Sequence, residues 1–241
     1  MPEAIHTPLI PWWWSVGGIL LLAAIHLFGV RLTFLKEIPR SRWLSFAGGV
    51  SVVYVFLHLM PAIAEAEEHF AKFHDELGER IPYILGLLGL LVTYGAARHG
   101  RTKRNHDQPS LGFWLHMGSF SIYNVIAGYV SRQQPPTIPI LFISMLALAF
   151  HYLVVDHGLR AEHRYLYQHY GRWLLAGALI VGWSIPFLFT VRPYVLAGLE
   201  AFLAGGIILN VLKEELPKER QSKFTPFLIG IMVYAPIMVL A

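Results

Sequence analysis

The sequence lacks cysteine and contains few charged residues. Without cysteine there can be no disulfide framework, Cys-ligated zinc site, iron–sulfur cluster or thiol catalysis. Charged residues make up 14% of the 241 positions, whereas about a quarter is usual in soluble domains. Hydrophobic residues make up 55%, and the mean hydropathy is +0.51. We therefore expect a membrane protein that could bind a metal only through His, carboxylate, amide or Met groups.

Apolar runs of membrane-spanning length occur eight times along the chain. They cover residues 10–33, 43–63, 82–97, 111–130, 137–155, 173–191, 194–212 and 225–241. No Lys or Arg precedes the first run, which is also longer than the apolar part of a signal peptide, so we expect it to remain as a helix. The sequence thus predicts an all-α bundle of eight transmembrane helices that forms one integral membrane domain, 1–241.

The basic residues alternate between the predicted loops. Fifteen of the 19 Lys and Arg residues follow the first, third, fifth and seventh runs, and only Lys72, Arg80, Arg132 and Arg192 lie on the other side. The positive-inside rule places the richer side in the cytosol and both termini outside. The net charge of +4 therefore reflects topology, and we expect the lipid bilayer, with no nucleic acid, as a partner. The compact chain suggests a bacterial inner membrane.

Ionisable and amide side chains inside the predicted helices are candidates for function, because burying them in hydrocarbon is costly. A helical rise of about 1.5 Å per residue places His58 and Glu200 at similar depth, about 8–9 Å below the outer face. A second level, near the inner face, comprises His26, His116, His151 and Asn210. Asn124 lies near mid-membrane, and Asp156 reaches the cytosolic edge.

These polar levels have two readings. Imidazole and carboxylate groups suit zinc, iron, manganese and similar divalent ions, and weak binding at several levels would let an ion both enter and leave. Alternatively, intramembrane His and Asn side chains form hydrogen bonds between helices, and Asp156 is only an interfacial carboxylate. Glycines at Gly48–Gly49, Gly118, Gly128 and Gly205–Gly206 are expected to serve helix packing.

Two stretches resemble motifs of the ZIP (Zrt/Irt-like) family of divalent-metal transporters. Gly48-Gly49-Val50 leading to His58-Leu59-Met60-Pro61 looks like the family stretch that ends in His-Leu-Leu-Pro. Ala201-Phe202-Leu203-Ala204-Gly205-Gly206 running to Glu214-Glu215-Leu216-Pro217 resembles its Phe-x-Ala-Gly stretch that ends in Glu-Glu-Leu-Pro. The resemblance implies a ZIP-like fold, with His58 near the outer approach and Glu214 and Glu215 near a cytosolic exit. Glu200, at the depth of His58, is a further candidate for entry or exit.

The family's metal site is built from helices four and five, where this chain matches it only in part. Asn124 and Gly128 match the first motif, but Tyr123 replaces its His and Ala127 its acid. In the second motif, the first His and the last acid remain as His151 and Asp156. The resemblance thus implies Asn124, His151 and Asp156 as metal ligands, to which this chain would add His116, closer to the cytosol.

The function expected from these residues is transport of a divalent cation of the zinc, iron or manganese class toward the cytosol. Zinc is the expected substrate, and we expect neither enzyme activity nor an organic cofactor. Three alternatives remain: a noncatalytic ZIP-like sensor or partner subunit whose metal site is lost, a haem protein that uses His116 and His151, and an intramembrane hydrolase. A homodimer is left open as the assembly.

Overall fold

The chain forms eight helical segments in a computed structural model that describes residues 13–29, 42–71, 75–100, 111–133, 138–215 and 223–240. The described residues contain no strand. The segments are α1 (Trp13–Phe28); α2 (Arg42–Tyr54), η3 (Val55–Leu59), α3 (Met60–Glu65) and α4 (Glu67–Phe70); α5 (Asp75–Gly100); α6 (Leu111–Gln133); α7 (Ile138–Glu162); α8 (Arg164–Leu166), η4 (Tyr167–Gly171), α9 (Arg172–Ser184) and η5 (Ile185–Phe187); α10 (Pro193–Asn210) and η6 (Val211–Glu215); and α11 (Phe224–Leu240). The all-helical prediction is confirmed, and the described part of each predicted run lies on one of these segments, apart from Gly29, just after α1, and residues 188–191 at the end of the sixth run.

Four of the helical segments are long and apolar enough to cross a bilayer: Arg42–Phe70, Leu77–Arg98, Ile138–Glu162 and Pro193–Lys213. Trp13–Phe28 and Phe224–Leu240 are apolar but shorter. Helix α6 has 23 residues, but polar side chains such as Ser119, Asn124 and Ser131 are buried along it. These polar side chains of α6 therefore face the protein interior.

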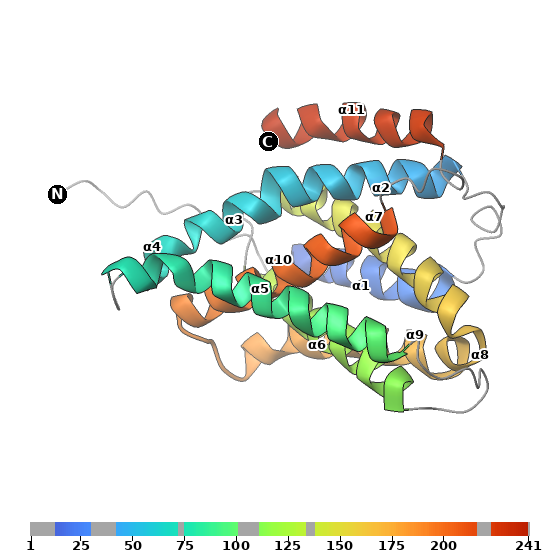
Figure 1. Cartoon of the computed structure of the whole chain (residues 1–241), viewed down its shortest axis with the longest axis horizontal. Coiled ribbons are helices and arrows are strands. Elements are labelled where there is room, and N and C mark those ends of the chain that lie inside the picture. The colour runs from blue at the N-terminus through green and yellow to red at the C-terminus, as the bar shows by residue number, and fades with distance from the viewer. Residues whose placement is uncertain are drawn as a thin grey trace.

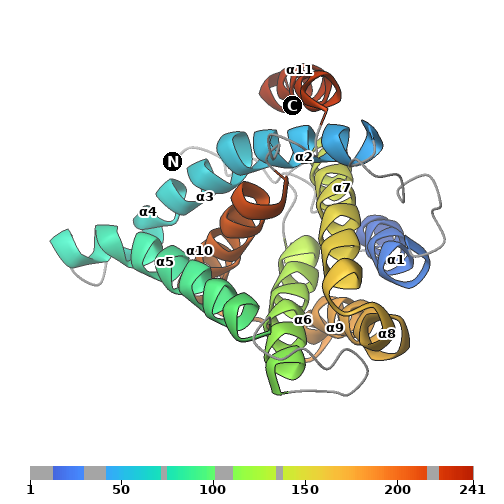
Figure 2. The same cartoon turned by 45° about the vertical axis from the view of Figure 1, so that its right-hand side comes forward.

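Successive helical segments run in alternating directions along the chain, whereas the packed pairs α5 with α10, α6 with α9 and α2 with α11 each run in the same direction (Figure 1). Helix α10 lies inside the bundle, where it contacts α3, α4, α5 and α6. Helix α11 packs on α2 at the outside of the bundle, as Figure 2 shows. The main hydrophobic core lies between these helices and includes Leu22, Val50, Leu179 and Ala204.

Glycines allow the closest helix crossings. A Cβ atom at Gly205 of α10 would overlap the backbone of Gly86 on α5, and one at Gly128 of α6 would overlap the backbone of Leu179 on α9. Small residues at such positions let helix backbones approach closely. The packing role predicted for Gly118 is wrong for the described part of the chain, where no atom outside the nearby backbone of α6 lies within 4 Å of a Cβ added there.

A π-helical turn interrupts the second segment at the position of His58. Pro61 has no backbone N–H to donate, and its ring crowds the carbonyl of the residue four positions earlier. The N–H of Met60 instead bonds to the carbonyl oxygen of Val55, which widens the turn Val55–Leu59. The predicted His-Leu-Met-Pro stretch therefore forms a π turn that carries His58.

Candidate functional site

The two outer-level residues predicted from depth, His58 and Glu200, line one cavity. The cavity has a volume of about 360 Å³ and lies between the second segment, α6, α7 and α10. Glu65 and His69 also line it, and the rings of Tyr54 and His58 stack with centroids 5.0 Å apart. Two carboxylates and two imidazoles thus surround the same space, which we call the outer cavity after the predicted level of His58 and Glu200.

His26 connects two of the predicted metal ligands through hydrogen bonds. Its Nδ1 atom lies 2.8 Å from Oδ1 of Asp156 on α7, and its Nε2 atom lies 3.0 Å from Oδ1 of Asn124 on α6. The imidazole is 1% exposed and packs against the Tyr152 ring, with centroids 4.6 Å apart. The side chain of His26 therefore lies between Asn124 and Asp156, where the resemblance implied a metal.

The hydrogen bonds of Asn124 determine which ring nitrogen of His26 donates to it. The Asn124 amide nitrogen donates to the Phe120 carbonyl, 2.8 Å away, which can only accept. The Asn124 oxygen therefore faces His26, so Nε2 of His26 must carry a hydrogen. The 2.8 Å contact between Nδ1 and Oδ1 of Asp156 then pairs the carboxyl group directly with the imidazole.

The second oxygen of Asp156 is buried near the end of α1. A Cβ added at Gly29 would lie 3.7 Å from this Oδ2 atom, which is buried, as is the Tyr167 hydroxyl. Tyr167 lies outside the predicted spans; burial raises the pKa of its phenol, and the Asp156 charge raises it further. Neither the Tyr167 hydroxyl nor Oδ2 of Asp156 forms a hydrogen bond with the described residues.

The two residues that depart from the family's helix-four motif, Tyr123 and Ala127, have different surroundings. The Tyr123 hydroxyl donates to the Gly89 carbonyl on α5 at 2.6 Å and accepts from Thr93 at 2.7 Å. Its ring fills the space beside Gly206 on α10. Tyr123 therefore joins three helices, whereas Ala127 lines the outer cavity.

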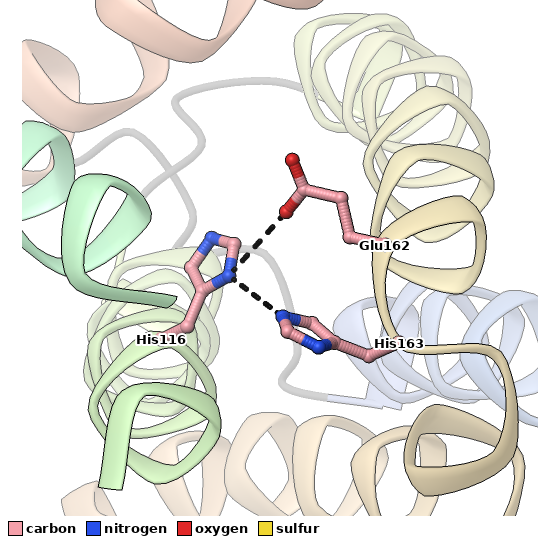
Figure 3. A group of neighbouring side chains, drawn as sticks. All are labelled: His116, Glu162 and His163. Carbon is pink, nitrogen blue, oxygen red and sulfur yellow. Dashed lines mark hydrogen bonds and ion pairs between the residues drawn. The ribbon is translucent and has the colours of Figure 1, made fainter. Parts of the chain in front are cut away.

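His116 lies apart from the other predicted ligands. Its Nδ1 atom is 3.4 Å from Nε2 of His163 and 3.7 Å from Oε2 of Glu162 (Figure 3). Among the described residues, this is the one set of three or more His, Asp or Glu side chains with potential ligand atoms within 4.8 Å of one another. His151 is buried on α7, 3% exposed, and its ring lies 6.1 Å from that of Tyr152. The side chains of Glu214 and Glu215, predicted near an exit, lie outside the described part of the structure.

Sequence reasoning missed the roles of Glu162 and His163, because they follow the apolar run of the fifth predicted helix. Helix α7 continues beyond residue 155, the predicted end of that run, to Glu162. The available signal was an acid–imidazole pair just after the fifth apolar run, at the end of that run that was predicted to be cytosolic, as His116 was predicted to be near the cytosol.

No protein-family model, curated protein or solved structure matches the chain.

Proposed function

We propose that this chain is a transporter of divalent cations of the zinc, iron and manganese class. The bundle crosses a bacterial inner membrane eight times with both termini outside, and the metal moves toward the cytosol. The observation that carries the proposal is the cavity lined by His58, Glu65, His69 and Glu200. A cavity among apolar helices is the position where a transported ion would bind during alternating access.

The chemistry of the lining suits a dication. A cleft that carries carboxylates between low-dielectric walls focuses a negative field and raises the local concentration of cations. Imidazole and carboxylate together are typical ligands of zinc, iron and manganese. Their ligand atoms do not form a cluster within 4.8 Å among the described residues, which favours weak binding that allows the ion to pass on.

The ZIP-like motif positions support the same proposal. His58, from the His-Leu-Met-Pro stretch, and Ala127, at the acid position of the helix-four motif, both line the cavity. The alternating distribution of basic residues supports the eight spans and the outside termini.

Uptake into proteoliposomes tests this function. Purified protein is reconstituted, and entry of Zn²⁺ is followed with a zinc dye in the lumen. The parent is compared with Glu200→Gln, which removes a carboxylate from the cavity, and with Glu79→Gln, which removes an exposed carboxylate on α5 away from the lining. We expect uptake by the parent, and a half-saturating zinc concentration raised about tenfold or more, equivalent to about 1.4 kcal/mol, only in Glu200→Gln.

Two outcomes contradict different parts of the proposal. Folded protein that admits no more zinc than protein-free liposomes would reject transport. Uptake with equal half-saturation in parent and Glu200→Gln would retain transport but reject the cavity as the entrance.

One observation favours a second candidate function, a noncatalytic ZIP-like sensor or partner subunit. His26 already holds Asn124 and Asp156, and Tyr123 ties α6 to α5. These contacts stabilise one arrangement of the helices at the positions where the family binds its substrate. The His151→Ala variant helps to separate the two functions: a transporter that uses the implied site loses uptake, whereas absent uptake in both parent and variant favours the noncatalytic protein.

A further inference from the structure

We propose that His116, Glu162 and His163 form a second, separate divalent-metal site that binds zinc. His116 lies on α6 near its start, Glu162 is the last residue of α7, and His163 occupies the bend before α8. Figure 3 shows the three side chains pointing toward one another from these elements. Metal binding here does not depend on transport; only a role as the exit-side station rests on the proposed function.

The two distances from Nδ1 of His116 fit a tetrahedral metal better than they fit hydrogen bonds, and the ligand atoms of Glu162 and His163 lie within 4.8 Å of each other. With metal–ligand bonds of about 2.0–2.2 Å, adjacent ligand atoms of a tetrahedral zinc lie about 3.3–3.5 Å apart. The separations of 3.4 Å to His163 and 3.7 Å to Glu162 are close to this spacing. As direct contacts, 3.4 Å is long for a hydrogen bond and 3.7 Å is beyond its range.

Aromatic packing holds both imidazoles in place. The His163 ring meets the edge of Phe113, with centroids 5.3 Å apart, and the His116 ring lies 5.2 Å from that of Phe120. Both phenylalanines belong to a separate hydrophobic cluster between α6, α7 and α9, in which Phe113 is fully buried. Ligands whose rotamers are fixed by packing lose little freedom when a metal binds.

The donor set and its exposure determine which ion fits and how it enters. Two neutral imidazoles and one carboxylate suit zinc and similar transition metals, whereas calcium and magnesium prefer oxygen ligands alone. The His116 side chain is 6% exposed and the Glu162 side chain 29% exposed, so an ion would approach on the Glu162 side. Three protein ligands leave a fourth position for water, as in exchangeable zinc sites.

The test is Co²⁺ and Zn²⁺ binding to the purified full-length protein in detergent. All variants carry Glu200→Gln to weaken the outer cavity as a competing site. In this background we compare Glu162→Gln, Glu162→Asp, His163→Gln and the control His169→Gln, which removes an exposed imidazole from η4 outside the group. Size-exclusion chromatography and circular dichroism check that each variant is folded.

We expect a four-coordinate Co²⁺ absorption spectrum that Zn²⁺ abolishes by displacement. Glu162→Gln and His163→Gln should weaken Zn²⁺ binding at least tenfold, Glu162→Asp should restore much of it, and His169→Gln should bind as the background protein does. Binding that is absent, or equal within twofold in all variants, overturns the site. If binding shows the expected pattern but the parent protein takes up no zinc in proteoliposomes, the site is retained and transport is rejected. If the parent takes up zinc but binding lacks this pattern, transport is retained and the site is rejected.

Discussion

Replacement of Asp156 tests whether the hydrogen bond to His26, rather than the negative charge, stabilises the bundle. In Asp156→Asn the new amide can donate to Nδ1 of a neutral His26 whose hydrogen is on Nε2. The contact with Asn124 then persists, and the amide oxygen takes the position of Oδ2, a buried atom that accepts no hydrogen bond from the described residues. Every partner remains, so the loss in unfolding free energy should be about 1 kcal/mol or less.

Asp156→Ala removes the partner altogether. The His26 imidazole, 1% exposed, keeps a polar atom that neither water nor protein satisfies. Leaving such a group unpaired costs about 1–3 kcal/mol. The space of the missing carboxyl group adds a cavity term, so the total is about 3 kcal/mol.

Thermal unfolding in detergent, followed by intrinsic tryptophan fluorescence, measures the difference. For a chain of this size, 1 kcal/mol corresponds to a shift of about 2–4 °C in the midpoint. Asp156→Asn should therefore lower the midpoint by about 4 °C at most, and Asp156→Ala by about 6–12 °C. An equal, large loss in both variants would refute the hydrogen-bond reasoning and assign the stability to the Asp156 charge.

Three further substitutions test the helix crossing and the cavity lined by His58 and Glu200. Gly205→Ala should destabilise the fold by about 1–3 kcal/mol, because the added Cβ overlaps the Gly86 backbone, whereas Gly118→Ala should be neutral or stabilising in the same thermal assay. Equal midpoints would show that α5 and α10 can separate freely. Ala127→Glu adds a carboxylate to the cavity lining and should tighten Co²⁺ or Zn²⁺ binding about tenfold or more in equilibrium titration, and an unchanged affinity would contradict the cavity as a cation site.

The helices were predictable because apolar runs of this length have few alternatives to a buried or membrane-spanning helix. Their ends were less predictable. The third run was expected over 82–97, yet α5 spans Asp75–Gly100. The helix continues at both ends into polar residues, which a search for apolar runs does not include. The same extension carries α7 to Glu162 and positions it beside His116.

The proximity of His58 and Glu200 to one cavity agrees with their predicted common level. His58 and Glu200 were placed at one level from the helical rise alone, and both line one cavity. The π turn at Val55–Leu59 shifts the register of the helix by less than one turn, so it does not upset this estimate. Depth is set by counting residues, which a sequence supplies directly.

Partners within a level were not predictable, because they depend on how each helix is rotated and tilted against its neighbours. His26 and His116 were placed at similar depth, yet His26 points to Asn124 and Asp156 while His116 points to His163. Apolar side chains lie on all sides of these helices. Their distribution around the helix axis therefore gives little guide to how each helix is rotated. Helix crossings such as that of Gly86 with Gly205 fix the rotation instead, and they are properties of pairs of helices that no single segment reveals.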